Sequence, residues 1–301
     1  MIKKKIIIDT DIGDDVDDSF ALALALKNPA LDVIGITTVY KNAALRAKIV
    51  KAELKAFHKT NIDVVAGLDK PLKIPFNVFK YETLDQDGKP IMTAFSQEYS
   101  EGADRFDAPE YLLEKAREYP HDITLVAIGP LTNLAAAIKK NPADFTLFKE
   151  IIMMGGSNSD CKEWNIFCDP EAADIVLKCG VPITMVPIEC TIKCAVEDRH
   201  YEKLLHPQNE EESFLLDMYK RWRKDQTRPC QMHDCLALQE LNSSYCEFVN
   251  KYIYAPLVTT ERGKTISIND EKPNVKIAIG VRNDEFMDSL FNTLYQQRVS
   301  G

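Results

Sequence analysis

The 301-residue sequence lacks any apolar run close to the roughly 20 residues that a membrane-spanning helix needs. Its first apolar run, residues 6–8, follows three lysines but stops at Asp9, so it is too short for the core of a signal peptide. Basic residues are also scarce, because 37 Lys and Arg stand against 46 Asp and Glu, giving a net charge of −9. Nucleic acids and anionic membranes are bound by clustered Lys and Arg. We therefore expect a small-molecule partner, and neither a nucleic acid nor a membrane.

The eight cysteines form no CxxC pair and no recognisable metal-binding spacing. Cys190 with Cys194, and Cys230 with Cys235, are too weakly patterned to predict zinc sites. Scattered cysteines in a chain of this length are typical of reduced thiols, so we expect a cytoplasmic protein whose cysteines are buried and unreactive. The sequence shows no linker, repeat or low-complexity tract, and we expect one domain over residues 1–301.

Apolar runs and helical patterns alternate along most of the chain. We predict strands at 6–8, 31–39, 62–66, 123–128, 150–154 and 181–188, and helices at 19–26, 42–58, 108–119, 134–140 and 170–179. This alternation predicts an α/β fold, a doubly wound and mainly parallel sheet with helices on both faces. Residues 69–105 have no clear period, and such long irregular segments are usually functional or mobile.

The C-terminal part predicts a small elaboration of this fold. Residues 197–223 and 234–241 have helical patterns, and a closing helix is expected over 284–297. Strands are predicted at 254–260, 264–269 and 276–282, with Gly263 in a hairpin turn. We therefore expect a β-hairpin and helices to complete the doubly wound sheet.

The most unusual segment holds six carboxylates in ten residues, at Asp9, Asp11, Asp14, Asp15, Asp17 and Asp18. No Lys or Arg lies between Lys5 and Lys27 to offset them. The acids lie between a predicted strand and a helix, at the edge of the sheet where open α/β folds bind ligands. Capping of the helix would explain one or two of them but not six. Hard divalent cations take oxygen ligands, and Ca²⁺ accepts more ligands in looser geometry than Mg²⁺. The segment therefore predicts a metal site.

Further polar residues follow other predicted strands or begin helices. Taken singly, each could be a helix cap or a solvated loop residue. In a doubly wound sheet, however, these positions share one rim, and convergent polar groups beside apolar surface are typical of ligand pockets. The residues concerned are Asn42, Thr132, Asn133, Glu163, Asn165, His233 and Asp234.

Six motifs in order resemble the inosine-uridine preferring nucleoside hydrolases. They are DTDIGDDVDD, the Asn after ITTV, VAIGPLTNLA, MMGG, EWNIFCDPEAA and HDCLAL, and they extend from residue 6 to residue 238. The resemblance implies a doubly wound α/β domain that hydrolyses the N-glycosidic bond of ribonucleosides with a tightly held Ca²⁺. It also implies a homo-oligomer, either a homodimer or a homotetramer.

The resemblance assigns roles to individual residues. Asp11 would both bind the metal and take a proton from the attacking, calcium-bound water. The remaining metal ligands would be Asp18, the main-chain oxygen of Ile128 and Asp234. Residues expected to bind the ribose are Asp17, Asn42, Met154, Glu163 and Asn165. His233 would assist departure of the base, since histidine is the usual proton donor near neutral pH.

The chain departs from the family pattern in three places. Two extra residues separate Gly13 from the paired acids, so either Asp14-Asp15 or Asp17-Asp18 could fill the paired role. We prefer the later pair, because the sequence after it continues into the helix as the signature does. Ile12 replaces a common proline, and the segment after Pro71 lacks an expected His-Gly motif. The family resemblance therefore supports the residues expected to bind ribose better than it supports any that would bind the base.

Two other functions compete. A strand followed by Asp9-x-Asp11 is also the first motif of haloacid-dehalogenase-type phosphohydrolases, in which Asp9 would be the nucleophile and Mg²⁺ the cofactor. That hypothesis expects Thr or Val at position 13, where this chain has Gly13, and it gives the EWN and HD motifs no role. The third hypothesis is a nucleoside or sugar sensor without turnover.

Overall fold

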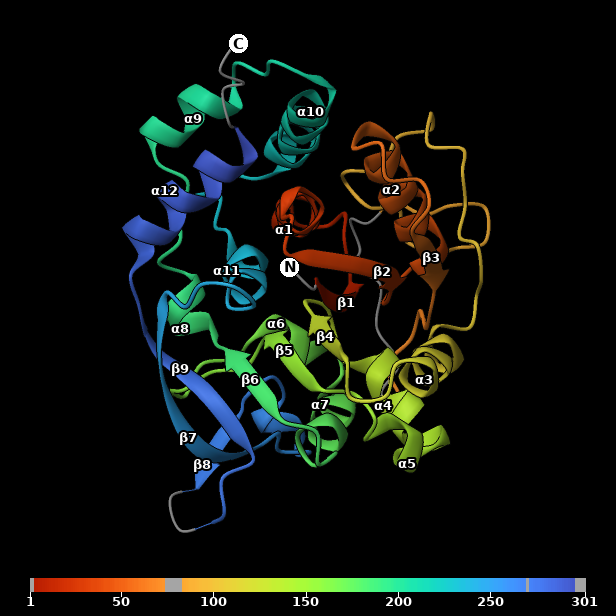
Figure 1. Ribbon diagram of the computed structural model, residues 1–301, viewed down its shortest axis with the longest axis vertical. Coiled ribbons are helices and arrows are strands. Elements are labelled where there is room, and N and C mark those ends of the chain that lie inside the picture. Colours follow the sequence, from red (N-terminus) through yellow and green to blue (C-terminus); the bar gives the residue numbers. More distant parts are fainter. Residues whose placement is uncertain (1–2, 74–82, 269–270, 296–301) are drawn as a thin grey trace.

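The computed structural model describes residues 3–73, 83–268 and 271–295. Within these residues, nine strands form one sheet in the order β3-β2-β1-β4-β5-β6-β9-β7-β8 (Figure 1). The strands are β1 (Lys4–Thr10), β2 (Leu31–Thr38), β3 (Asp63–Ala66), β4 (Ile123–Ala127), β5 (Glu150–Met154), β6 (Ile183–Val186), β7 (Cys246–Tyr254), β8 (Ile266–Ile268) and β9 (Val275–Val281). The predicted doubly wound α/β fold is confirmed.

The sheet is parallel from β3 through to β9, and β7 runs antiparallel to both β9 and β8. From β1 the chain adds β2 and β3 on one side, then returns to add β4 on the other side. The winding direction therefore reverses between β1 and β4. In open α/β sheets, the carboxyl ends of the strands at such a reversal enclose a crevice for ligands.

Helices cover both faces of the sheet and enclose two separate apolar cores. In Figure 1 the first layer lies above the sheet and the second below it. The first layer contains α1 (Asp17–Lys27), α2 (Ala43–Ala56), α10 (Glu210–Asp225), α11 (His233–Gln239) and α12 (Asn283–Leu294). The second contains α3 (Ala108–Glu118), α4 (Thr132–Lys140), α5 (Pro142–Phe145) and α7 (Pro170–Leu177). The remaining helices are α6 (Trp164–Cys168), α8 (Ile188–Thr191), α9 (Asp198–Leu204) and the 3₁₀ helix η1 (Thr259–Glu261).

The three isoleucines of β1 show how the strand serves both layers. Side chains alternate along a strand, so Ile6 and Ile8 pack into the first core and Ile7 into the second. All three are fully buried. A strand buried on both faces reads as an unbroken apolar run, which is why the sequence predicted it correctly.

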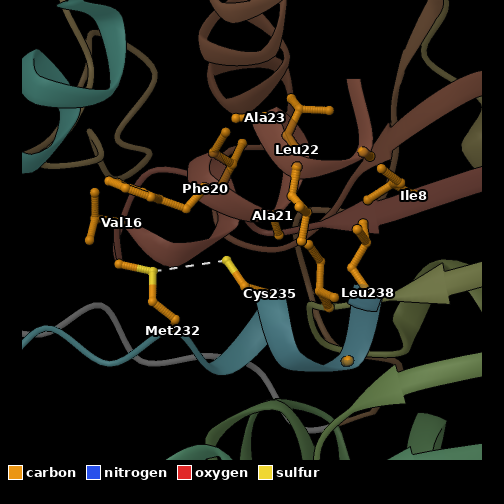
Figure 2. Close-up of a cluster of buried hydrophobic side chains, with 14 of the residues drawn as sticks. Ile8, Val16, Phe20, Ala21, Leu22, Ala23, Met232, Cys235 and Leu238 are labelled. Carbon is orange, nitrogen blue, oxygen red and sulfur yellow. Dashed lines mark hydrogen bonds between the residues drawn. The ribbon is translucent and has the colours of Figure 1, made fainter. Parts of the chain in front are cut away.

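The packing of α1 against α11 positions the acidic segment. Phe20 and Ala21 of α1 meet Cys235 and Leu238 of α11 in one buried apolar cluster (Figure 2). The Cys235 thiol also donates to the main-chain oxygen of Asp17, at 3.6 Å. The first turns of two helices, more than 200 residues apart in sequence, therefore lie side by side.

The C-terminal prediction was partly wrong. A strand was expected at 254–260. The structure instead has β7 at Cys246–Tyr254, and the chain after it leads to η1. Pro256 lacks the N–H that a paired strand must donate, and β7 itself is too polar to show a clear alternation. Gly263 has a left-handed φ of +90° but follows η1 and does not form a tight hairpin turn. Part of the predicted closing helix, 296–297, lies outside the described residues.

The expectation that the cysteines are buried holds for six of the eight. All eight are free, and those at 168, 190, 194, 230, 235 and 246 are buried. Cys179 is half-buried, and Cys161 is exposed, against expectation. In the described part of the chain, no helix has both the length and the apolar character needed to cross a bilayer.

Candidate active site

A cavity of about 1060 Å³ opens where the carboxyl ends of β1, β4 and β5 meet the first turns of α1 and α11. Nine of the ten residues predicted for the site line this cavity. They are Asp11, Asp17, Asp18, Ile128, Met154, Glu163, Asn165, His233 and Asp234. The irregular segment before α3 contributes Thr83, Ile91, Met92, Thr93 and Phe95, so it forms part of one wall. Residues 74–82 of that segment lie outside the described residues.

Asn42 is the one of these ten that does not line the cavity, and Thr132 and Asn133 of the predicted rim do not line it either. Thr132 and Asn133 begin α4, where they donate to Asp169 and Asp9. The side-chain oxygen of Asn42 accepts a hydrogen bond from the N–H of Leu45, which makes Asn42 the N-cap of α2. Its amide nitrogen donates to Asp85 at 2.8 Å and lies 3.4 Å from the main-chain oxygen of Pro90. Both polar atoms of the amide are engaged, so Asn42 joins α2 to the irregular segment.

Three carboxylates gather at the start of the two paired helices. Oxygen atoms of Asp17, Asp18 and Asp234 all lie within 4.8 Å of one another, and all three residues are buried. The N–H of Asp234 donates to Asp17 Oδ2 at 3.1 Å, and the Thr10 hydroxyl donates to Asp18. The packing of α1 against α11 seen in Figure 2 brings these carboxylates together from segments more than 200 residues apart.

Burial makes the negative charge of this cluster unfavourable. It raises the pKa of Asp11 to about 7 and that of Asp17 to about 8. Burial and the neighbouring carboxylates raise the pKa of Asp18 and of Asp234 well above the usual range. A bound divalent cation would reverse these shifts, and the donor set of carboxylate oxygens fits a hard cation.

Two further acids of the segment, Asp14 and Asp15, are neutralised by basic side chains. The Arg46 guanidinium donates to Asp14 at 2.9 Å, and the Lys41 ammonium lies 3.1 Å from the same carboxylate. Although burial raises the pKa of Asp14, these two cations hold it below its usual value. Arg228 forms an ion pair with Asp15. The arrangement favours Asp17 and Asp18 as the paired acids of the signature, since they lie beside Asp234.

Arg46 was missed from the sequence, although a signal was present. It is fully buried on α2 and donates to the main-chain oxygens of Tyr40, Asp11 and Ile12. Its neighbours at the spacing of a helical face are Ala43 and Val50, both in the core. A charged residue on the apolar stripe of an amphipathic helix indicates a buried polar partner.

Glu163 and Asn165 fix the loop after β5. The Glu163 carboxylate caps α6 by accepting from the N–H groups of Asn165 and Ile166, and it also accepts from Gly156 at 3.0 Å. The Asn165 amide donates to the main-chain oxygens of Ile128 and Met154, at 3.1 and 3.2 Å. These hydrogen bonds hold the main chain of Ile128 and of Met154 at the cavity wall.

His233 lies at the cavity beside Asp234. Its Nδ1 forms a 2.8 Å hydrogen bond with the Thr191 hydroxyl, a partner that no sequence motif indicated. Burial lowers the pKa of His233 to about 4, so the neutral imidazole is the form expected at pH 7.

Asp9, the nucleophile of the phosphohydrolase hypothesis, does not line the cavity. It is 1% exposed, and it accepts hydrogen bonds from the Thr37 hydroxyl and from the Asn133 amide at 2.8 Å. A nucleophile must be reachable by substrate. The structure therefore gives that hypothesis no support.

Gly129, which directly follows Ile128, packs closely against the predicted metal ligand Asp11. A Cβ at this position would lie 2.8 Å from the backbone nitrogen of Asp11 and 3.0 Å from its carboxylate. We expect Gly129→Ala to displace Asp11 and to lower kcat/KM on a nucleoside by about 100-fold, a typical effect of misplacing a reacting group. Gly102→Ala is the control, because a Cβ there meets nothing within 4 Å. Equal activity of the two variants would contradict the expectation.

Comparison with known proteins agrees with this geometry. Residues 6–288 match the family model described as inosine-uridine preferring nucleoside hydrolase. The chain is 31% identical over 310 residues to probable uridine nucleosidase 2 of Arabidopsis thaliana, covering 93% of this chain and 94% of that protein.

Solved structures give the same result. A plant nucleoside hydrolase, the PpNRh1 enzyme, superposes with a TM-score of 0.80 and 27% identity over 98% of this chain and 99% of that one. The purine-preferring ribonucleoside hydrolase from Gardnerella vaginalis gives a TM-score of 0.81 and 26% identity over 97% and 98% of the two chains. The chain therefore belongs to the inosine-uridine preferring nucleoside hydrolase family, and it is a hydrolase that acts on the N-glycosidic bond of ribonucleosides.

Proposed function

We propose that this enzyme releases free base and ribose from ribonucleosides with Asp11 as the general base. The observation that carries the proposal is the buried group of Asp17, Asp18 and Asp234 in one cavity with Asp11. Such a group can hold a cation beside a carboxylate that remains available for proton transfer.

We propose Ca²⁺ as the cation. Its ligands would be the carboxylates of Asp11, Asp18 and Asp234 and the main-chain oxygen of Ile128. A donor set made only of oxygen, with several carboxylates, is typical of calcium. When bound, the cation would lower the pKa of the attacking water and hold sugar hydroxyls.

Ribose would occupy the part of the cavity between α1 and α6. Asp17, Glu163 and Asn165 line it and carry groups that hydrogen-bond to hydroxyls, and Met154 supplies an apolar wall. Because Asn42 caps α2 and contacts the irregular segment, its contribution to ribose binding would be the placement of that wall.

Cleavage would proceed through a transition state with oxocarbenium character. As the bond between C1′ and the base nitrogen breaks, its electron pair moves to the base. Water adds to C1′ and gives its proton to the Asp11 carboxylate. The fixed carboxylates around the ribose stabilise the positive charge that develops on the sugar ring.

A panel of nucleosides tests the proposal. Uridine, cytidine, inosine, guanosine and adenosine are incubated with the enzyme, and free ribose is measured as reducing sugar. We expect equal amounts of base and ribose, loss of activity in a chelator, and recovery with Ca²⁺. Binding of nucleosides without release of ribose would instead support the sensor.

We propose that His233 assists departure of the base. Because its imidazole is neutral at pH 7, this assistance would come from the remaining N–H of the ring. His233→Ala should slow hydrolysis of the best natural nucleoside by about 10²–10⁴-fold, the usual range for loss of a group that takes part in proton transfer. A p-nitrophenyl riboside needs little assistance, because its leaving group is stable as an anion, so it should be affected far less. Equal losses on both substrates would show that His233 only positions the site.

We also propose a cytoplasmic enzyme that is a homodimer or a homotetramer. The free cysteines support a reducing compartment. Analytical ultracentrifugation tests the assembly, and a single species with the mass of one chain would contradict it.

A further inference from the structure

The active-site cavity is lined by a basic side chain, Arg228, to which the proposed function gives no role. It lies on the segment that leads into α11. Lys41, Lys162 and Arg228 are the basic residues besides His233 that line it within the described residues. Lys41 pairs with Asp14, and Lys162 lies beside the ribose-facing Glu163. Arg228 lies five positions before His233, on the segment that leads into α11, so it is the permanent positive charge nearest the candidate leaving-group residue in sequence.

Arg228 is held at this place from two sides. Its Nη2 donates to Asp15, and its guanidinium carbon lies 5.5 Å from the centre of the Trp222 ring. Nη1 lies 3.4 Å from the side-chain oxygen of Gln231, which is a long contact. These contacts use two of the five N–H donors of a guanidinium. The side chain is 44% exposed, so donors remain for a molecule in the cavity.

Asp15 makes this arrangement possible. It belongs to the acidic segment that is two residues longer than the family signature, and it also lines the cavity. Without a partner of its own, a guanidinium here would be drawn toward the unpaired carboxylates of Asp17 and Asp234. The ion pair with Asp15 gives the guanidinium a partner outside the group of Asp17, Asp18 and Asp234.

We propose that Arg228 stabilises the negative charge on the departing nucleobase, and that Asp15 is the positioning residue that orients Arg228. The inference rests on the proposed hydrolysis and adds the group that receives the leaving base. The C1′–N electron pair passes to the base nitrogen and spreads to the carbonyl oxygens of the base. The planar guanidinium donates hydrogen bonds to these oxygens, and the base takes a proton from solvent after release.

The test compares leaving groups of different acidity. Uridine, 5-fluorouridine and p-nitrophenyl riboside share the ribose but leave as progressively more stable anions. In Arg228→Met we expect kcat/KM to fall by about 100-fold on uridine, as for loss of one charge-stabilising donor. The loss should be smaller on 5-fluorouridine and about threefold or less on the p-nitrophenyl riboside. Arg228→Lys should recover part of the uridine activity, because it restores the charge but not the planar donors.

Two further variants separate orientation from folding. Asp15→Asn should lower kcat/KM on the three substrates in the same order as Arg228→Met. Each fold-loss should be about a tenth as large, because the variant frees Arg228 without removing it. Arg221→Met is the matched control, since Arg221 also pairs with a carboxylate, Asp217 at 2.8 Å, and lies over an aromatic ring. It does not line the active-site cavity, so all three substrates should react at the wild-type rate.

The outcomes distinguish this inference from the proposed function. If wild-type enzyme releases ribose but Arg228→Met loses activity equally on all three substrates, or loses none, the role of Arg228 is overturned and the hydrolysis stands. If wild-type enzyme releases no ribose from any nucleoside, the proposed function fails and this inference falls with it. Circular dichroism and metal content of each variant should match the wild type, and a misfolded Arg228→Met is replaced by Arg228→Gln.

Discussion

Asp11→Ala should abolish ribonucleoside hydrolysis, with kcat/KM for the best nucleoside falling by at least about 10⁴-fold. The variant would remove the general base and a metal ligand together, and loss of a single acid or base group alone costs about 10²–10⁴-fold. Release of ribose at saturating Ca²⁺ is the measurement. Asp32→Ala is the control, because Asp32 is an exposed aspartate on β2 away from the cavity.

Asp11→Asn separates the two roles. An amide keeps an oxygen that can bind a metal but cannot accept the proton of water. We expect this variant to retain some bound calcium while losing as much activity as Asp11→Ala. If either variant kept a tenth of the wild-type rate, the general base would have to be another carboxylate of the acidic segment.

Metal removal should destabilise the enzyme, and more strongly at pH 8 than at pH 5. Burial raises the pKa of Asp11 and of Asp17 to about 7 and about 8, above the ordinary value near 3.8. At pH values between 3.8 and these raised pKa values, the metal-free folded state holds more protons than the unfolded state. Its stability therefore falls as the pH rises. One unit of pKa corresponds to about 1.4 kcal/mol, so the loss from pH 5 to pH 8 should be on the order of several kcal/mol.

Bound Ca²⁺ should restore the lost stability, because it offsets the negative charge of the buried carboxylates as their protons do at low pH. The gain in melting temperature on adding Ca²⁺ to chelator-treated enzyme should therefore be larger at pH 8 than at pH 5. Asp18→Asn should remove most of this gain, yet it should raise the stability of the metal-free protein because it removes one charge from a crowded cluster. An equal melting temperature with and without chelator at both pH values would contradict a metal at this site, and stoichiometric zinc would contradict calcium.

The strands around the site could be predicted because they are short, apolar and buried on both faces. The rule that ligands bind at the carboxyl ends of parallel strands then placed Glu163 at the same rim as Asp11, and the family resemblance added Ile128; all three line the cavity. Asn42 was different. A residue at a helix start can cap or bind ligand, and sequence does not separate the two roles; here both atoms of its amide hold protein groups.

The partners of Asp14 and Asp15 could not be predicted, although the place of Arg46 on the apolar stripe of α2 indicated that it is buried. The absence of Lys and Arg near the six aspartates suggested that a bound cation alone offsets them. Arg46 and Arg228, 32 and 213 positions away from their partners, instead neutralise Asp14 and Asp15. Contacts over such sequence separations depend on how α2 and the segment before α11 pack, which no local pattern encodes.

The pairing of Asp14 and Asp15 with basic side chains also bears on the evolution of this loop. Two additional positions that bring Asp14 and Asp15 into a buried, already acidic loop would be strongly unfavourable in a chain without Arg46, Lys41 and Arg228. The longer loop and its cations should therefore be inherited together. Among related enzymes, we expect a basic residue at the position of Arg228 wherever the loop has this length, and a variable one wherever the loop is shorter.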